Sequence, residues 1–229
     1  MDKSLFQYVT IILLLLFLVF ALVNDQQQNT INVQGSSEQD TDPDVAIITM
    51  AYENIADSAS LAQQQNEQIV AQVNSALRNY VDSENIETTG FSVYEYKEWE
   101  DDSYVSKGYK ATHNLKITTD DLDLVGTIIS TSTSNGINRI NGISYDLSDE
   151  KMEQARLNAY NSAMTNARAK AQSIADASSV RLGKVVSVTE STSYYPVYRT
   201  LSAVEKDEDA YSPEDVTVTV TLDAQFRIS

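Results

Sequence analysis

The chain has 229 residues, enough for one domain of ordinary size and a membrane anchor. Its 33 acidic and 16 basic side chains give a formal charge of −17, which disfavours nucleic acid and anionic lipid surfaces as partners because both are polyanions. With no cysteine and one histidine, the chain excludes a disulfide scaffold, a cysteine enzyme and a multi-histidine metal centre. A solubilising acidic surface and adaptation to a saline exterior both fit this charge.

A hydrophobic segment lies near the amino terminus. Residues Leu5 to Val23 carry no charge, and as a helix they extend about 28 Å, close to the thickness of the hydrocarbon core. A cleaved signal peptide is the alternative, but no pair of small residues stands at A-x-A spacing before the polar tail. We therefore expect residues 1–23 to be an uncleaved transmembrane anchor, with Lys3 on the cytoplasmic side and the remainder extracytoplasmic.

A polar stretch follows the hydrophobic segment. Residues 24–42 are rich in Gln, Ser, Asn and Asp, which favours a linker between membrane and domain, although Thr30 to Gln34 fits a short strand as well. Pro43-Asp44 then marks the start of the domain that we predict over residues 43–229.

The first half of this domain alternates strands with helices. Hydrophobic periodicity predicts, in order, a strand at 45–51, an amphipathic helix at 56–81, strands at 86–99 and 109–118, a helix from Thr119 to Asn135-Gly136, and a strand at 140–147. The polar residues Glu100 to Ser103 join the second and third strands as a hairpin. This order predicts the split βαβ (ferredoxin-like) arrangement, with helices on one face of the sheet.

The second half is dominated by a long helix, from Ser148 to about Ser178, with alanine at every fourth position: 155, 159, 163, 167, 171 and 175. Such a stripe favours close packing inside the core, and an oligomer contact is the alternative. A strand at 185–190, an irregular segment from Ser191 to Asp215 and a strongly alternating strand from Val216 to Ile228 complete the chain. We expect an α+β fold with an antiparallel or mixed sheet, extended by the alanine-rich helix and the last two strands.

Taken together, several short motifs resemble the SIMPL domain (DUF541) family over about Ile31 to Ile228. The matching stretches are Pro43-Asp44-Val45-Ala46-Ile47, Asn85-Ile86-Glu87-Thr88 with Tyr94 and Tyr96, Gly108-Tyr109-Lys110-Ala111, Asp121-Leu122-Asp123-Leu124-Val125-Gly126, Gly142-Ile143-Ser144-Tyr145, Ala167-Arg168-Ala169-Lys170-Ala171, and Leu182-Gly183-Lys184-Val185 with Ser187 and Glu190. This chain departs from the family pattern at three places. Gly35 has no second glycine two positions on, the tyrosine strand lacks a proline, and Ser178-Ser179 replaces a helix-ending glycine.

The resemblance implies an extracytoplasmic domain, ring-like or channel-like homo-oligomers in some members, and links to envelope stress in bacteria. It supplies no catalytic residues, so none is assigned. We also assign no cofactor-binding or metal residues.

The candidate sites each have a simpler structural interpretation. His113 shares a strand face with Leu115 and Ile117, which favours a core histidine over a general base. The acidic hairpin tip lacks the spacing of an EF-hand, which favours a solvated turn over a calcium site. Its residues are Glu98, Glu100, Asp101 and Asp102. Tyrosines at 194, 195, 198 and 211 are candidate contact residues.

No phosphate-binding loop, nucleophile elbow or HExxH pattern is found in the sequence. We therefore expect a non-enzymatic, membrane-anchored envelope protein that self-associates as a homo-oligomer or binds another surface component. A sensor for a small ligand or a cation is the alternative, and an uncharacterised hydrolase is the least favoured hypothesis.

Overall fold

The computed structural model describes residues 29–191 and 215–229. The predicted anchor at Leu5 to Val23 and the four tyrosines of the irregular segment lie outside these residues. Within the described part of the chain, no helix has both the length and the hydropathy of a membrane span. The chain divides into two compact units. The described residues of the first unit are 39–156 and 215–218, and those of the second are 29–38, 157–191 and 219–229. The predicted domain extent, residues 43–229, stays a prediction.

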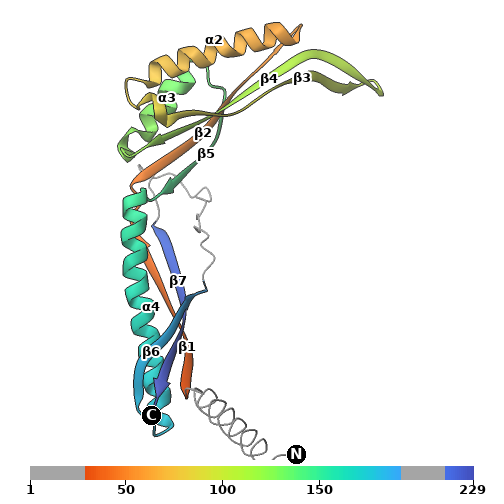
Figure 1. Ribbon diagram of the computed structural model, residues 1–229. Helices are drawn as coiled ribbons and strands as arrows, with labels where there is room; N and C mark the ends of the chain where they lie inside the picture. Colours follow the sequence, from red (N-terminus) through yellow and green to blue (C-terminus); the bar gives the residue numbers. More distant parts are fainter. Residues whose placement is uncertain (1–28, 192–214) are drawn as a thin grey trace, which may run out of the picture. The chain divides into compact units, whose positions relative to one another are not determined.

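The first unit contains a four-stranded antiparallel sheet in the order β3-β4-β2-β5. Along the chain, its elements alternate as the sequence predicts (Figure 1). They are β2 (Val45–Ala56), α2 (Ala59–Leu77), a short η1 (Ser83–Asn85), β3 (Ile86–Glu100), β4 (Ser103–Thr119), a short η2 (Leu122–Leu124), α3 (Val125–Ser134) and β5 (Arg139–Asp146). The ferredoxin-like element order is thus confirmed, and it places the first and third strands at the centre of the sheet.

Both helices of this unit pack on one sheet face. Alternate residues of β2 and β4 point inward, among them Ile48, Met50 and Leu115, each no more than 1% exposed. Val73 of α2 and Ile128 of α3 are fully buried against this face. The apolar residues that recur every second position in the strands and about every 3.6 positions in the helices therefore form one hydrophobic core.

The turns of this unit depend on local side-chain chemistry. The β3–β4 hairpin turns at Asp101 (φ 45°) and Asp102 (φ 59°), the left-handed pair that a two-residue type I′ turn requires. At the next helix the sequence prediction needs a correction. Thr119 ends β4 and receives the N–H of Asp121, whereas Asp121 itself caps η2 by accepting from the N–H of Asp123. The prediction that the following helix stops at Gly136 is confirmed, because this residue has φ of 119°.

The second sheet has three strands in the order β1-β7-β6, and α4 (Asp149–Ala177) lies along it (Figure 1). Its strands are β1 (Thr30–Thr41), β6 (Leu182–Glu190) and β7 (Val216–Ile228). Two predictions are corrected here. The last two strands form a separate sheet rather than extending the first, and β1 occupies most of the stretch predicted as a linker. β1 pairs with a strand nearly two hundred residues later, as the bond from Gln34 to Asp223 illustrates, and local sequence does not encode that partner.

The alanine stripe of α4 is buried, and a glycine of β1 lies directly on it. Ala159, Ala163 and Ala167 are 0% exposed. A Cβ at Gly35 would lie 2.1 Å from the carbonyl oxygen of Ala163 and 2.7 Å from the Cβ of Ala167. Such distances are far shorter than a van der Waals contact. No residue larger than glycine therefore fits at position 35, where β1 crosses α4.

The end of α4 explains one departure from the family pattern. Ser179 has φ of 55°, and the N–H of Val180 bonds to the carbonyl of Ala175 while the N–H of Ser179 bonds to that of Asp176. These are the two bonds of a Schellman motif. The serine thus adopts the left-handed conformation that glycine usually supplies.

Replacing Gly35 with alanine tests the close crossing. Gly35→Ala should destabilise the protein by about 1–3 kcal/mol, because the new methyl group forces β1 away from α4. Urea unfolding followed by circular dichroism measures this change. Gly142→Ala is the matched control in a strand, since its Cβ would be 3.8 Å from the nearest atom, the Thr49 Oγ1, and should cost little. Equal midpoints for the two variants would contradict the proposed steric limit.

Candidate functional site

His113 lies on the helix-covered face of β4 and is half-buried. Its Nε2 is 2.9 Å from Thr88 Oγ1, and the Phe91 ring lies 5.4 Å from the imidazole ring. Its Nδ1 is buried and has no hydrogen-bond partner among the described residues. The predicted position of His113 on the inner strand face is confirmed, but only one of its two nitrogens is satisfied. A general base needs an orienting partner on the second nitrogen, and this arrangement supplies none.

The environment of His113 lowers its pKa. Burial disfavours the imidazolium and is the larger effect, while the negative charge of Glu67 on α2 acts in the opposite direction. The ring is therefore held neutral inside the first unit.

The acidic hairpin tip is exposed and uses two of its carboxylates in contacts with neighbouring side chains. Glu98 accepts a hydrogen bond from the Tyr96 hydroxyl at 2.8 Å, and Glu100 pairs with Lys107 at 2.6 Å. Asp101 and Asp102 form the turn itself. In the described residues, no group of three or more carboxylate, imidazole or thiolate side chains converges to hold a metal ion.

Sequence reasoning missed a charged cluster centred on Glu53 of β2. Its carboxylate pairs with Lys110 of β4 at 2.7 Å and with Arg139 of β5 at 2.5 Å. Burial alone would raise the pKa of Glu53, but hydrogen bonds and the charges of Lys110 and Arg139 outweigh this effect and lower it. The three strands become neighbours only in the folded sheet, so no spacing in the sequence predicts the cluster. Because the Glu53 carboxylate pairs with two cations, we interpret the cluster as stabilising.

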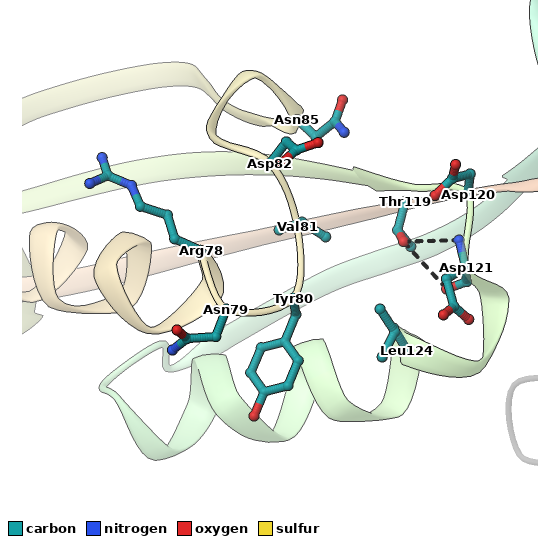
Figure 2. A pocket seen from close by; sticks show the side chains of 10 residues that line it. All are labelled: Arg78, Asn79, Tyr80, Val81, Asp82, Asn85, Thr119, Asp120, Asp121 and Leu124. Atoms are coloured by element: carbon teal, nitrogen blue, oxygen red, sulfur yellow. Dashed lines mark hydrogen bonds between the residues drawn. The ribbon is translucent and has the colours of Figure 1, made fainter.

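A polar pocket of about 370 Å³ lies at the carboxyl end of α2 (Figure 2). The end of α2 with the loop after it forms one wall, and the end of β4 with η2 forms the other. In Figure 2 the Thr119 hydroxyl accepts from the N–H of Asp121 at 3.1 Å and donates to its carbonyl at 3.3 Å, fixing that wall. The lining residues are Arg78, Asn79, Tyr80, Val81, Asp82, Asn85, Thr119, Asp120, Asp121 and Leu124.

The charge of this pocket is unbalanced. Three carboxylates, those of Asp82, Asp120 and Asp121, and one guanidinium, that of Arg78, line it. The carbonyl end of α2 adds partial negative charge. The pocket therefore suits a positively charged or hydroxyl-rich molecule better than an anion. The sequence analysis placed Asp120 and Asp121 at the start of the helix predicted from Thr119, and it did not connect them with the segment after α2.

The second sheet carries a shallow pocket of about 320 Å³, lined by residues of β1, β6 and β7, and exposed apolar side chains on β6. The alanine stripe, which we considered as an oligomer contact, is at most 3% exposed and is covered by the chain itself. On β6, by contrast, Val185, Val186 and Val188 are 36%, 44% and 44% exposed. Among the described residues, the most exposed large apolar side chains are Trp99 and Tyr104 of the β3–β4 hairpin, at 60% and 71%.

The lowered pKa of His113 predicts a loss of stability on mild acidification. The unfolded histidine binds its proton near pH 6.5, above the pKa of the folded state, so the free energy of unfolding should fall as the pH drops from 7.5 through 6.5 towards 5. Urea unfolding at these pH values measures the slope. His113→Gln should flatten it, while the contributions of Asp44 and Glu53, whose pKa values are lowered, should still be lost at more acidic pH. An unchanged slope in the variant would refute this assignment.

Comparison with known proteins identifies relatives whose functions are not described by their names. An "Uncharacterized protein YggE" from Edwardsiella ictaluri is 30% identical over 156 residues, which are 67% of this chain and 64% of that protein. The chain thus spans slightly less than two thirds of this relative. A "26 kDa periplasmic immunogenic protein" from Brucella melitensis is 28% identical over 191 residues, 79% of this chain and 76% of that protein. "Uncharacterized protein YggE" from Escherichia coli K12 is 27% identical over 175 residues, 74% of this chain and 70% of that protein.

The family profile agrees with the motifs found in the sequence. A protein family of unknown function, SIMPL (DUF541), matches residues 31–226, which include β1 and nearly all of β7. The match therefore covers both sheets. The chain belongs to the SIMPL family.

Proposed function

We propose that this protein is a non-enzymatic, membrane-anchored component of the cell envelope whose folded part self-associates or binds another surface component. The hydrophobic segment from Leu5 to Val23 supports the anchor. The word "periplasmic" in the name of the Brucella melitensis relative supports an extracytoplasmic position for the folded part.

The exposed valines of β6 are the observation that carries the association. Isolated apolar side chains on a surface need no explanation, but three valines on one strand combine apolar area with an edge at which no other described strand pairs. This combination is unusual on a chain with a net charge of −17, whose surface otherwise favours solvation.

The polar clusters of the described residues support a role without catalysis. The Glu53 carboxylate is neutralised by two cations, and His113 has no group that would orient it as a base. Neither cluster pairs an activated nucleophile with a base and a stabiliser of developing charge, the minimum that a hydrolase requires.

Membrane extraction and sizing test the proposal. The full chain should remain in the membrane after carbonate washing and should have the mass of the unprocessed protein, while a variant lacking residues 1–23 should become soluble. Blue-native electrophoresis of the detergent-extracted chain should show species larger than a monomer that dissociate on dilution. A soluble, processed protein would exclude the anchor. A species that is monomeric at every concentration and captures no envelope component would exclude the association.

The pocket at the end of α2 supports a second candidate function, binding of an organic cation. Its volume of about 370 Å³ is larger than a bare ion requires, and three carboxylates but only one guanidinium line it. A polyamine matches both properties, because its ammonium groups are spaced along an extended chain.

A thermal shift with spermidine tests this second function. At matched ionic strength, spermidine should raise the melting temperature, because a ligand that binds only the folded state stabilises it. The double variant Asp82→Asn with Asp120→Asn should lose the shift. Asp57→Asn, which removes an exposed carboxylate outside the pocket, is the control for nonspecific charge effects. Equal shifts in the wild type and the double variant would assign the effect to bulk screening.

A further inference from the structure

The end of the β3–β4 hairpin is a two-stranded arm, residues 95–108, that no other described strand joins. β2 pairs with β4 from Tyr109 onward, so residues 103–108 of β4 pair with β3 alone. The pairing within the arm is regular from Lys97 to Glu100, and the arm closes in the two-residue turn described above. A two-stranded ribbon has no core of its own, so nearly all side chains of this arm are exposed and open to a partner.

The largest side chains of the arm form an aromatic pair next to its turn. Trp99 and Tyr104 lie directly opposite each other on the two strands, with their ring centroids 4.9 Å apart in an edge-to-face arrangement. This contact stabilises the arm, yet it leaves 60% of Trp99 and 71% of Tyr104 exposed. Large, rigid rings of this kind gain contact area with a partner at a low cost in conformational entropy.

The arm carries an excess of negative charge around these rings. It has five carboxylates and two lysines, which give it a net charge of −3. Both lysines already pair within the arm, Lys97 with Glu95 at 2.8 Å and Lys107 with Glu100 at 2.6 Å. The other three carboxylates form no ion pair among the described residues. They belong to Glu98, Asp101 and Asp102.

Charge complementarity selects the occupant of this surface. The face of an aromatic ring attracts a cation that lies above it, and carboxylates beside the ring add to the attraction. A second copy of the arm would bring like charges together, and an anionic membrane surface would be repelled for the same reason. A guanidinium matches both features, because it stacks on an aromatic face and donates hydrogen bonds to carboxylates in a planar fork.

We propose that the arm binds an arginine-rich segment of another protein, with a guanidinium stacked on Trp99 and neighbouring cations paired with Asp101 and Asp102. This proposal rests on the binding of another surface component proposed above, and it names the surface and the chemistry of that partner. The binding involves no second copy of this chain.

Trp99 is the single tryptophan of the chain, so its fluorescence reports the binding without a label. A synthetic peptide of alternating arginine and glycine, added to the detergent-extracted full chain, should shift the emission to shorter wavelength because the indole leaves water. The same peptide with glutamate in place of arginine should give no shift. Equal responses to the two peptides overturn the proposal. If the emission shifts instead on reconstitution into phosphatidylcholine bilayers, or on concentrating the chain alone, the arm contacts the membrane or a second copy and the proposal fails.

Variants of the arm separate the rings from the charges. Tyr104→Leu, which removes one ring but keeps an apolar side chain, should weaken binding of the arginine peptide roughly fivefold. The double variant Asp101→Asn with Asp102→Asn should weaken it to a similar degree, and asparagine preserves the turn because it tolerates positive φ. Asp57→Asn with Glu84→Gln is the matched control, since it removes two exposed carboxylates outside the arm and should leave the affinity nearly unchanged. Circular dichroism checks that each variant folds.

The outcomes distinguish this proposal from the other functions proposed above. The pocket variant Asp82→Asn with Asp120→Asn should keep the full fluorescence response, because those residues line the pocket at the end of α2 and lie outside the arm. Equal affinities of the Asp101 and Asp102 double variant and its matched control overturn the assignment of the arm. The titration requires neither the anchor nor an oligomer, so its failure leaves the proposed function to be decided by membrane extraction and sizing.

Discussion

The close approach of β1 to α4 is the constraint on which the second sheet depends. At Gly35 the strand backbone leaves no room for a methyl group above Ala163 and Ala167, and these alanines are fully buried. Small residues on both sides allow backbone-to-backbone packing that a larger pair would prevent. The same proximity lets Lys170 and Asn166 bond to the outer edge of β1. One packing distance thus explains both the alanine spacing and the protection of one sheet edge.

Burial of the alanine stripe changes where association is expected. A helix stripe of small residues offers a contact surface only when it is exposed, and here the chain covers it with its own strands. Among the described residues of this sheet, the exposed large apolar side chains are the valines of β6. The two polar clusters of the first unit differ in their charge balance. Glu53 of β2 pairs with cations from β4 and β5, which compensate the burial of its charge. The pocket at the end of α2, by contrast, has more carboxylates than cations.

Local patterns predicted most of the elements because each depends on near neighbours. The alternation in β7, the amphipathic stripe of α2 and the polar residues of the hairpin turn all lie within a few positions along the chain. The inner strand face that carries His113 was predicted for the same reason. That its Nδ1 has no hydrogen-bond partner among the described residues was not predicted, because this depends on what α2 and the neighbouring strands place beside the ring. The pocket was missed likewise, since its walls are separated by about forty residues.

The sequence by itself determined the strand and helix types, the ferredoxin-like order of the first unit, the family and the absence of a thiol or multi-histidine site, because composition and periodicity are local properties of the chain. Tertiary structure decided the rest. It made β1 a strand by pairing it with β7, assigned the last strands to their own sheet, and placed β6 at an edge of that sheet. Pairing between distant segments depends on which surfaces fit together in space, and the local sequence around each segment does not encode that fit.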